Sequence, residues 1–165
     1  ILFLMPVANT SVLFATRYQK NEELEKEGFI YCGVINIEVA KQNAHLNNVD
    51  LTFLLGDMLT PYIEKNIKVD MIVSNPPYIY FNDKDVGENV RKYEPSIALF
   101  TNDEDGISIY KKIFDKLENI NFKYAYFEFG YTQKESLIKL LNNYSFKYEF
   151  RKDINNKDRM LKITK

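Results

Sequence analysis

Short runs of β-forming residues alternate with amphipathic stretches along this chain. The predicted strands cover residues 1–5, 29–35, 51–55, 69–74, 124–129, 146–151 and 159–164. Between them, apolar residues recur at helical spacing over residues 10–19, 37–46, 106–117 and 134–142. Such an alternation is typical of parallel strands joined by crossover helices. The sequence therefore predicts an α/β fold with one open, mostly parallel sheet of seven strands.

The last two predicted strands are joined in a different way. The connection between them, residues 153–157, is rich in turn-forming residues and too short for a crossover helix. Strands joined by so short a connection pair antiparallel. We therefore expect the sheet to end in a C-terminal antiparallel hairpin.

Composition and charge exclude several classes of protein. With 165 residues, 45% of them hydrophobic, the chain suits one compact domain, predicted to span residues 1–165. A net charge of −1 provides no basic field for a nucleic acid. One cysteine, Cys32, rules out an internal disulfide and a zinc cluster, and residues 1–5 are far too few to cross a bilayer. We expect a cytoplasmic protein without a metal, a membrane or a direct nucleic-acid partner.

The most informative motif is the tetrapeptide Asn75-Pro76-Pro77-Tyr78. It follows the apolar run 69–74, which places it at the carboxyl end of a strand, where open α/β sheets bind ligands. The two prolines restrict the backbone and remove two donors, but their carbonyl oxygens remain as acceptors. Asn75 adds a side-chain acceptor. Asn75 and Pro76 can therefore each accept one hydrogen from a planar NH2 group, while Tyr78 packs on its flat face.

Holding a planar nitrogen has a chemical purpose. An amide or aromatic amine is a poor nucleophile, because its lone pair is delocalised into the attached π system. Near-attack orientation can lower such a barrier by several kcal/mol, up to about 7 to 11. The motif thus predicts transfer of a group to such a nitrogen, with Asn75, Pro76 and Tyr78 as the catalytic residues. A rigid turn that merely ends the strand is the alternative interpretation.

The sequence resembles the HemK/PrmC family, protein glutamine-N5 methyltransferases that act on the Gly-Gly-Gln motif of peptide chain release factors. The resemblance runs from about Gly33 to the C-terminus. Its motifs occur in order at residues 74–79, 90–95 with 98–99, 104–106 with Tyr110, 128–130 with Gln133, and 157–160. Adenine-modifying DNA and RNA methyltransferases share the tetrapeptide alone. The ordered set of motifs is therefore more specific than the tetrapeptide.

The resemblance implies a Rossmann-like class I methyltransferase fold and the cofactor S-adenosyl-L-methionine. It also implies that residues 75–78 bind the glutamine of a release factor as the protein substrate. Residues 79–105 should border the substrate groove. The small helical substrate-docking domain of the family is expected to be missing in front of Ile1.

The cofactor is expected at two places in the sequence. The turn Gly56-Asp57-Met58 resembles the segment that contacts the cofactor's adenine, where Asp57 can accept from the adenine amine and Met58 can pack on the ring. Asn75 is expected to border the cofactor as well as the substrate. For Asp57, an acidic residue favoured by a helix dipole is the alternative interpretation.

Two segments depart from the family pattern, and both concern the cofactor. Where the family has an acidic residue and a glycine-rich loop, this chain has Met5-Pro6-Val7-Ala8-Asn9. The acidic residue expected to bind the ribose after the second strand has no counterpart at residues 33–36. Because glycine permits the closest backbone approach to a cofactor, we predict weak cofactor binding. Degeneration, compensating contacts and a damaged sequence remain as explanations.

Two rival functions stay open. The first is a nucleic-acid adenine or guanine methyltransferase, against which the near-neutral charge and residues 93–95 argue. The second is a degenerate, non-catalytic binding protein that keeps the substrate groove, which the altered loop at residues 5–9 favours. His45 is expected to face solvent rather than to act as a base. Glu128 is left outside the predicted site, because it can equally be a structural acceptor.

Overall fold

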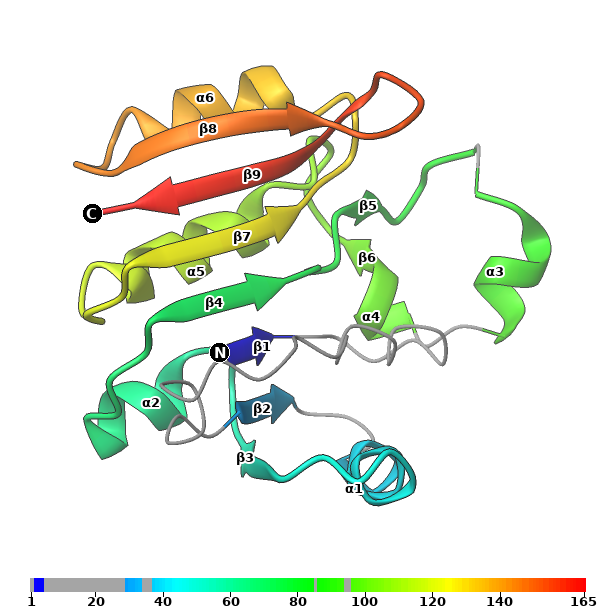
Figure 1. The fold of residues 1–165 in the computed structure, drawn as a ribbon. Helices are drawn as coiled ribbons and strands as arrows, with labels where there is room; N and C mark the ends of the chain where they lie inside the picture. The colour runs from blue at the N-terminus through cyan, green and yellow to red at the C-terminus, as the bar shows by residue number, and fades with distance from the viewer. Residues whose placement is uncertain (1, 5–28, 34–36, 85, 94–95) are drawn as a thin grey trace.

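The computed structural model describes residues 2–4, 29–33, 37–84, 86–93 and 96–165 (Figure 1). Its main sheet has seven strands in the order β3-β2-β1-β4-β7-β9-β8. They are β1 (Leu2–Leu4), β2 (Phe29–Gly33), β3 (Leu51–Leu55), β4 (Met71–Ser74), β7 (Tyr124–Glu128), β8 (Lys147–Lys152) and β9 (Asp158–Thr164). Neighbours from β3 to β7 are parallel, whereas β9 is antiparallel to both β7 and β8. The result is a mixed α/β sheet with a C-terminal antiparallel hairpin.

The strand β4 lies in the middle of this sheet. Its last residue, Ser74, is paired with Leu4 of β1 on one side and with Phe127 of β7 on the other. The chain passes outward from β1 through β2 to β3 and then returns to β4 on the other side of β1. The strand order therefore reverses between β1 and β4, and the carboxyl ends at such a switch point form a ligand-binding crevice.

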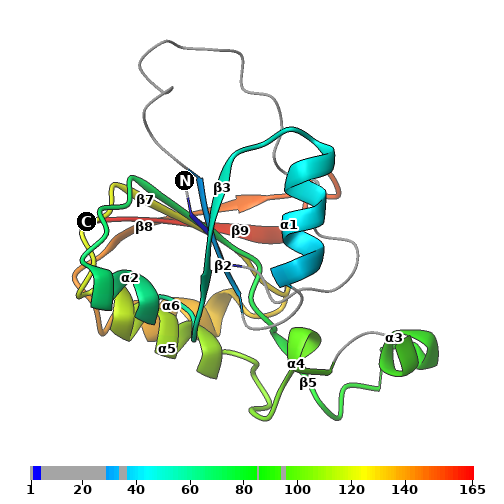
Figure 2. The same ribbon diagram turned by 90° about the horizontal axis from the view of Figure 1, so that it is seen from below.

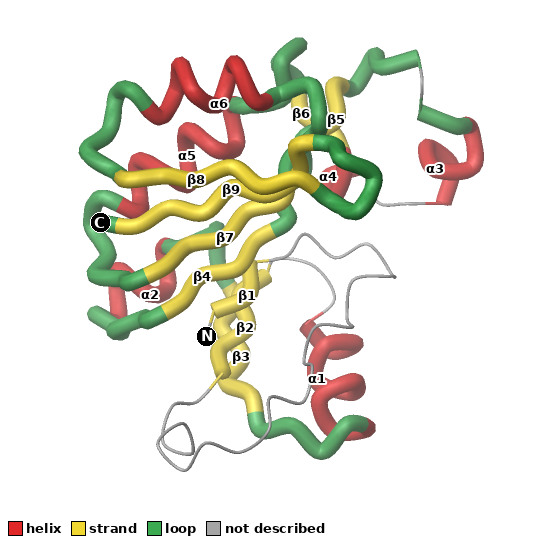
Figure 3. The backbone as a smooth tube through the Cα atoms, turned by 45° about the horizontal axis from the view of Figure 1, so that its top comes forward, coloured by secondary structure: helices red, strands yellow, loops and turns green. Residues whose placement is uncertain are grey.

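Helices cover the sheet unequally. They are α1 (Ile37–Leu46), α2 (Thr60–Lys65), α5 (Ser108–Leu117) and α6 (Lys134–Leu141). Figure 2 shows α2, α5 and α6 along one face, with α1 on the other side of β2 and β3. The tube in Figure 3 shows α5 and α6 behind the strands β7, β8 and β9. Among the described residues, most of the core therefore lies between α5, α6 and the β4–β7–β9 part of the sheet.

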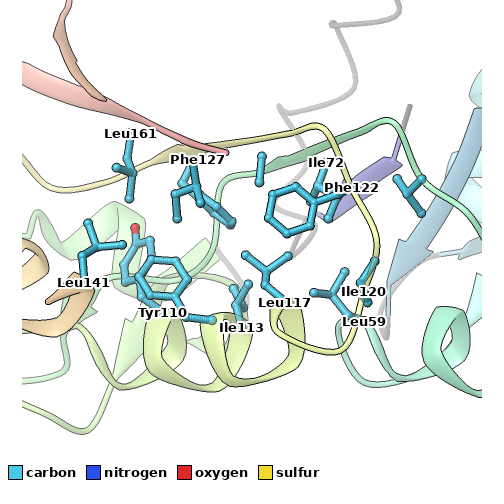
Figure 4. Close-up of a cluster of buried hydrophobic side chains, with 14 of the residues drawn as sticks. Leu59, Ile72, Tyr110, Ile113, Leu117, Ile120, Phe122, Phe127, Leu141 and Leu161 are labelled. Atoms are coloured by element: carbon cyan, nitrogen blue, oxygen red, sulfur yellow. The ribbon is translucent and has the colours of Figure 1, made fainter. Parts of the chain in front are cut away.

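That core is built from one face of α5. Its buried residues Tyr110, Ile113, Phe114 and Leu117 recur at helical spacing. Figure 4 shows Tyr110, Ile113 and Leu117 pointing toward the strands. The ring of Phe114 meets that of Phe127 of β7 edge-on, with centroids 5.6 Å apart. Burying each such side chain stabilises the fold by about 1.5 to 3 kcal/mol. This packing sets the position of α5 and of the loop before it.

Several short elements differ from the sequence prediction. The helix α2 is not among the predicted helices. Residues 79–105, where no helix or strand was predicted, contain β5 (Ile79–Tyr80), α3 (Glu88–Tyr93), α4 (Ser96–Leu99) and β6 (Phe100–Thr101). The strands β5 and β6 pair parallel as a second, two-stranded sheet. Elements of two to six residues are too short to show a periodicity. The helix predicted at 10–19 lies outside the described residues.

Candidate active site

The tetrapeptide Asn75-Pro76-Pro77-Tyr78 joins β4 to β5 at the switch point of the sheet (Figure 1). Pro76 is buried, while Asn75, Pro77 and Tyr78 are half-buried. The segment is held at its start by the pairing of Ser74 with β1 and β7. The structure thus places these four predicted residues together at the edge where ligands are expected.

The side-chain oxygen of Asn75 is the most unusual polar atom of this segment. Asn75 Oδ1 is buried and has no hydrogen-bond partner among the described residues. Leaving a buried acceptor unpaired costs about 1 to 3 kcal/mol, and native proteins rarely retain such a group without a reason. An acceptor of this kind matches the expected role of Asn75, which is to take a hydrogen from an NH2 group.

Tyr78 is held through its hydroxyl group by two side chains. The hydroxyl donates to Glu128 Oε1 at 3.2 Å and accepts from an Arg159 guanidinium nitrogen at 3.4 Å. Burial, reinforced by Glu128 and opposed by Arg159, raises the pKa of Tyr78 to about 12. The ring therefore stays uncharged near neutral pH. Because Glu128 and Arg159 hold its hydroxyl group, the Tyr78 side chain is fixed in position, partly buried against the core.

The main chain of Tyr78 is also held, through its carbonyl oxygen. Gln133 Nε2 donates to the Tyr78 carbonyl oxygen at 3.0 Å and to the Asp105 carbonyl oxygen at 2.8 Å. Gly106 follows with a positive φ of 64°, and a Cβ atom at this position would lie 2.2 Å from the Tyr78 oxygen. Only glycine allows this approach. Four motifs far apart in the sequence therefore meet around Tyr78.

The segment between β5 and β6 is also tied down by polar contacts. Arg91 of α3 donates to the Phe81 carbonyl oxygen at 2.8 Å and to the Asp83 carbonyl oxygen, and its guanidinium lies 5.1 Å from the centroid of the Phe100 ring. Four apolar side chains on the segment are exposed: Phe81, Val90, Tyr93 and Ile97. This segment thus carries exposed apolar side chains next to the tetrapeptide, while its backbone is fixed by Arg91.

The predicted adenine contacts lie on the turn after β3. Asp57 Oδ2 forms an ion pair with Lys116 of α5 at 3.0 Å, and its side chain is 68% exposed. Met58 has a positive φ of 51° and packs partly buried against the core. The structure therefore directs Asp57 toward Lys116 and leaves it accessible. The roles of Asp57 and Met58 at a cofactor stay predictions.

Three contact residues of Tyr78 were not in the predicted site. They are Glu128, Gln133 and Arg159, from the end of β7, the start of α6 and the strand β9. The signal that could have found them is their place in the ordered motifs. The altered loop at residues 5–9 lies outside the described residues. Of the predicted ribose segment at residues 33–36, only Gly33 at the end of β2 is described.

The chain is similar in sequence to curated proteins. No family model matches the chain. The release factor glutamine methyltransferase of Flavobacterium psychrophilum is 38% identical over 131 residues, and that of Bacillus anthracis is 40% identical over 132 residues. These alignments cover 77% and 76% of this chain and 46% of each relative. The chain therefore spans about half the length of the curated relatives it matches.

Solved structures show a likeness in fold. A ribosomal protein L11 methylase from Lactobacillus delbrueckii subsp. bulgaricus has a TM-score of 0.55 at 14% identity, covering 87% of this chain and 61% of that one. A methyltransferase from Pyrococcus furiosus has a TM-score of 0.54 at 14% identity, covering 87% and 66%. This likeness confirms the predicted Rossmann-like class I fold. Over about three quarters of its length, the chain is thus similar in sequence to release factor glutamine methyltransferases, and the motifs that carry the resemblance meet around Tyr78.

Proposed function

We propose that this chain forms the catalytic part of an S-adenosyl-L-methionine-dependent methyltransferase. Its proposed acceptor is the side-chain amide nitrogen of the glutamine in the Gly-Gly-Gln motif of a peptide chain release factor. The observation that carries the proposal is the buried, unpaired Oδ1 of Asn75 at the carboxyl end of β4. The relatives that share this sequence are release factor glutamine methyltransferases by name, which supports the same substrate here.

The tetrapeptide suits a primary amide because the amide has two hydrogens to donate. Asn75 Oδ1 would accept one hydrogen, and the Pro76 carbonyl oxygen would accept the other. Two hydrogen bonds prevent the NH2 group from rotating about its axis. Its nitrogen is thereby held at one angle, and orientation of this kind can supply much of the rate enhancement.

Tyr78 is proposed to pack its ring against the flat face of the substrate amide. Because Glu128 and Arg159 hold its hydroxyl group, the ring can offer a fixed apolar surface rather than a competing hydrogen bond. In the reaction the nitrogen gains a bond to the methyl carbon and loses one proton. That proton becomes acidic once the nitrogen is tetrahedral, so no strong base is required in the site.

The cofactor is proposed to bind beside Asn75, with its adenine near Asp57 and Met58. The accessible Asp57 carboxylate can accept from an amine, and the thioether of Met58 can pack on a ring. An exposed acceptor beside a thioether is a combination of groups that can bind an adenine, which supports this placement. When bound, S-adenosyl-L-methionine would supply a methyl group attached to a positively charged sulfur. Transfer of the methyl group turns the sulfur into a neutral thioether.

A methyl-transfer assay tests the proposal. The full chain is incubated with methyl-labelled S-adenosyl-L-methionine and a release factor, beside the same release factor with its Gly-Gly-Gln glutamine replaced by glutamate. We expect label on the first protein and none on the second. DNA and tRNA serve as further substrates, because they report the rival nucleic-acid activity. Label on adenine with none on the release factor would contradict the proposal.

A second candidate function is a non-catalytic protein that binds the same glutamine segment. The sequence Met5-Pro6-Val7-Ala8-Asn9 in place of a glycine-rich loop favours it, because side chains and Pro6 hinder close backbone approach. Titration calorimetry separates the two functions. We expect the chain to bind S-adenosyl-L-methionine roughly ten- to a hundredfold more weakly than a variant with a glycine-rich loop and an aspartate after Val34, since each lost charged hydrogen bond costs about 1.5 to 3 kcal/mol.

A further inference from the structure

Gln133 has a fully paired side chain in the interior of the molecule. It is 7% exposed. Its Nε2 donates to the carbonyl oxygens of Tyr78 and Asp105, and its Oε1 accepts from the Gly130 backbone N–H at 2.8 Å. The opposite orientation of the amide would place an oxygen against two carbonyl oxygens and an NH2 group against an N–H. The hydrogen-bonding chemistry therefore determines how this side chain is oriented.

The position of Gln133 in the chain would normally call for a different side chain. It is the N-cap residue of α6, where serine, threonine, aspartate or asparagine usually bonds to the first turn of the helix. Gln133 makes no such side-chain cap bond. Its amide reaches away from α6 to Tyr78, a residue 55 positions earlier in the sequence. The helix α6 thus has no side-chain cap from Gln133, and the Gln133 amide binds the tetrapeptide instead.

Two glycines make room for this amide. A Cβ atom on Gly106 would lie 2.4 Å from Gln133 Nε2, and one on Gly130 would lie 3.0 Å from Gln133 Oε1. The first distance is far below an allowed contact and the second is tighter than ordinary packing. Gln133, the Tyr78 carbonyl and the two loops consequently have little freedom to move relative to one another.

We propose that Gln133 is a positioning residue for the glutamine-binding tetrapeptide, which it holds through the Tyr78 carbonyl. The inference rests on the proposed function of that segment. Pairing of β4 with β1 and β7 holds the tetrapeptide at its start, and Gln133 holds it at its end. Between these two points lie Asn75 and Pro76, whose oxygens must both face one NH2 group. Releasing the Tyr78 end allows the two oxygens to lose their common alignment.

A kinetic experiment on the full chain tests this role. In Gln133→Met the side-chain length is kept and all three hydrogen bonds are lost, whereas Gln133→Glu keeps the acceptor for Gly130 and loses both donors. We expect each variant to lower kcat for methylation of a release factor at least tenfold. The Kd for S-adenosyl-L-methionine should change much less than kcat, because the cofactor contacts proposed at Asp57 and Met58 are elsewhere and only the contact beside Asn75 is affected. Gln42→Glu, the same chemical change on the exposed surface of α1, should leave both quantities unchanged.

A spectroscopic experiment is independent of activity. In ¹⁵N-labelled protein, Gln133→Met should shift the side-chain NH2 resonances of Asn75 and the backbone amide resonance of Tyr78, with the resonances of β8 unchanged. Gln42→Glu should shift neither. If the wild-type chain methylates nothing, the proposed function fails, and the resonances still decide whether Gln133 positions the tetrapeptide. Full kcat in folded Gln133→Met, or unshifted resonances of Asn75 and Tyr78, would overturn the inference.

Discussion

The tetrapeptide and the Gly56-Asp57-Met58 turn are both expected to bind ligands, but their surroundings differ. Around Tyr78, polar groups from three distant segments pair with this one residue; Gln133 is buried, Arg159 is half-buried and Glu128 is exposed. At the turn, Asp57 makes an ion pair with its carboxylate largely in solvent. A buried hydrogen-bond network loses much of its contribution to stability when one member is replaced, whereas an exposed ion pair contributes little stability to begin with. Substitutions at the first site should therefore have much larger effects than those at the second.

The largest effect on stability is expected from Gly106→Ala. A left-handed φ costs a non-glycine residue about 1 to 2 kcal/mol, and overpacking adds about 1 to 3 kcal/mol. The free energy of unfolding, measured in urea, should fall by about 2 to 5 kcal/mol. Gly87→Ala is the matched control, because an added Cβ there meets no atom within 4 Å. Equal stability of the two variants would show that the backbone at Gly106 and Tyr78 can move apart to accommodate an added Cβ atom.

Asn75→Ala should separate activity from stability. Loss of the proposed hydrogen bond to the substrate amide costs about 1 to 3 kcal/mol, and misorientation of the nitrogen adds to this, so kcat should fall at least tenfold. Because Asn75 Oδ1 has no partner among the described residues, the free energy of unfolding should stay the same or rise. The exposed Asn121→Ala provides the control. A loss of stability without loss of turnover would mean that Asn75 is a structural acceptor.

Tyr78→Phe tests the hydroxyl contacts through their pH dependence. The raised pKa of Tyr78, about 12 against an ordinary 10.0, means that the folded state retains the proton after the unfolded state has lost it. The resulting stabilisation is complete below about pH 10 and is lost as the pH rises toward 12. Tyr78→Phe should be less stable than wild type by about 0.5 to 1.5 kcal/mol at pH 8. In urea unfolding above pH 10, the difference in the free energy of unfolding between wild type and Tyr78→Phe should decrease. A difference that does not change with pH would contradict this assignment.

The smallest effect is expected from Asp57→Ala. Exposed ion pairs contribute about 0 to 1 kcal/mol, and Lys116 can keep its bond to the Thr60 hydroxyl. Urea unfolding should show a loss within that range, which should shrink at high salt because exposed charges are screened. Calorimetry should show roughly a tenfold loss in cofactor affinity, the lower end for a charged hydrogen bond, because the Asp57 carboxylate is largely in solvent. A stability loss above about 2 kcal/mol would remove the contrast between the two regions.

Much of the fold could be predicted from the sequence because its signals are local. Alternating apolar runs indicated the strands of the sheet, and the short connection at 153–157 indicated the hairpin of β8 and β9. The elements within residues 79–105 escaped prediction because none exceeds six residues. In the candidate site, the place of residues 75–78 at the end of β4 followed from the apolar run before them. The outward turn of Asp57 toward Lys116 did not, because it depends on where α5 packs.

The end of strand β4 and the acceptors beside it follow from the residue types alone, because proline and asparagine have these properties in any fold. The contacts that hold these residues follow from the packing of distant segments. Glu128, Gln133 and Arg159 lie 50, 55 and 81 positions after Tyr78. They reach it because β7 and β9 follow β4 in the sheet and α6 begins beside their ends. Hydrophobic periodicity reports only neighbours along one element, whereas strand order and register bring distant residues into contact.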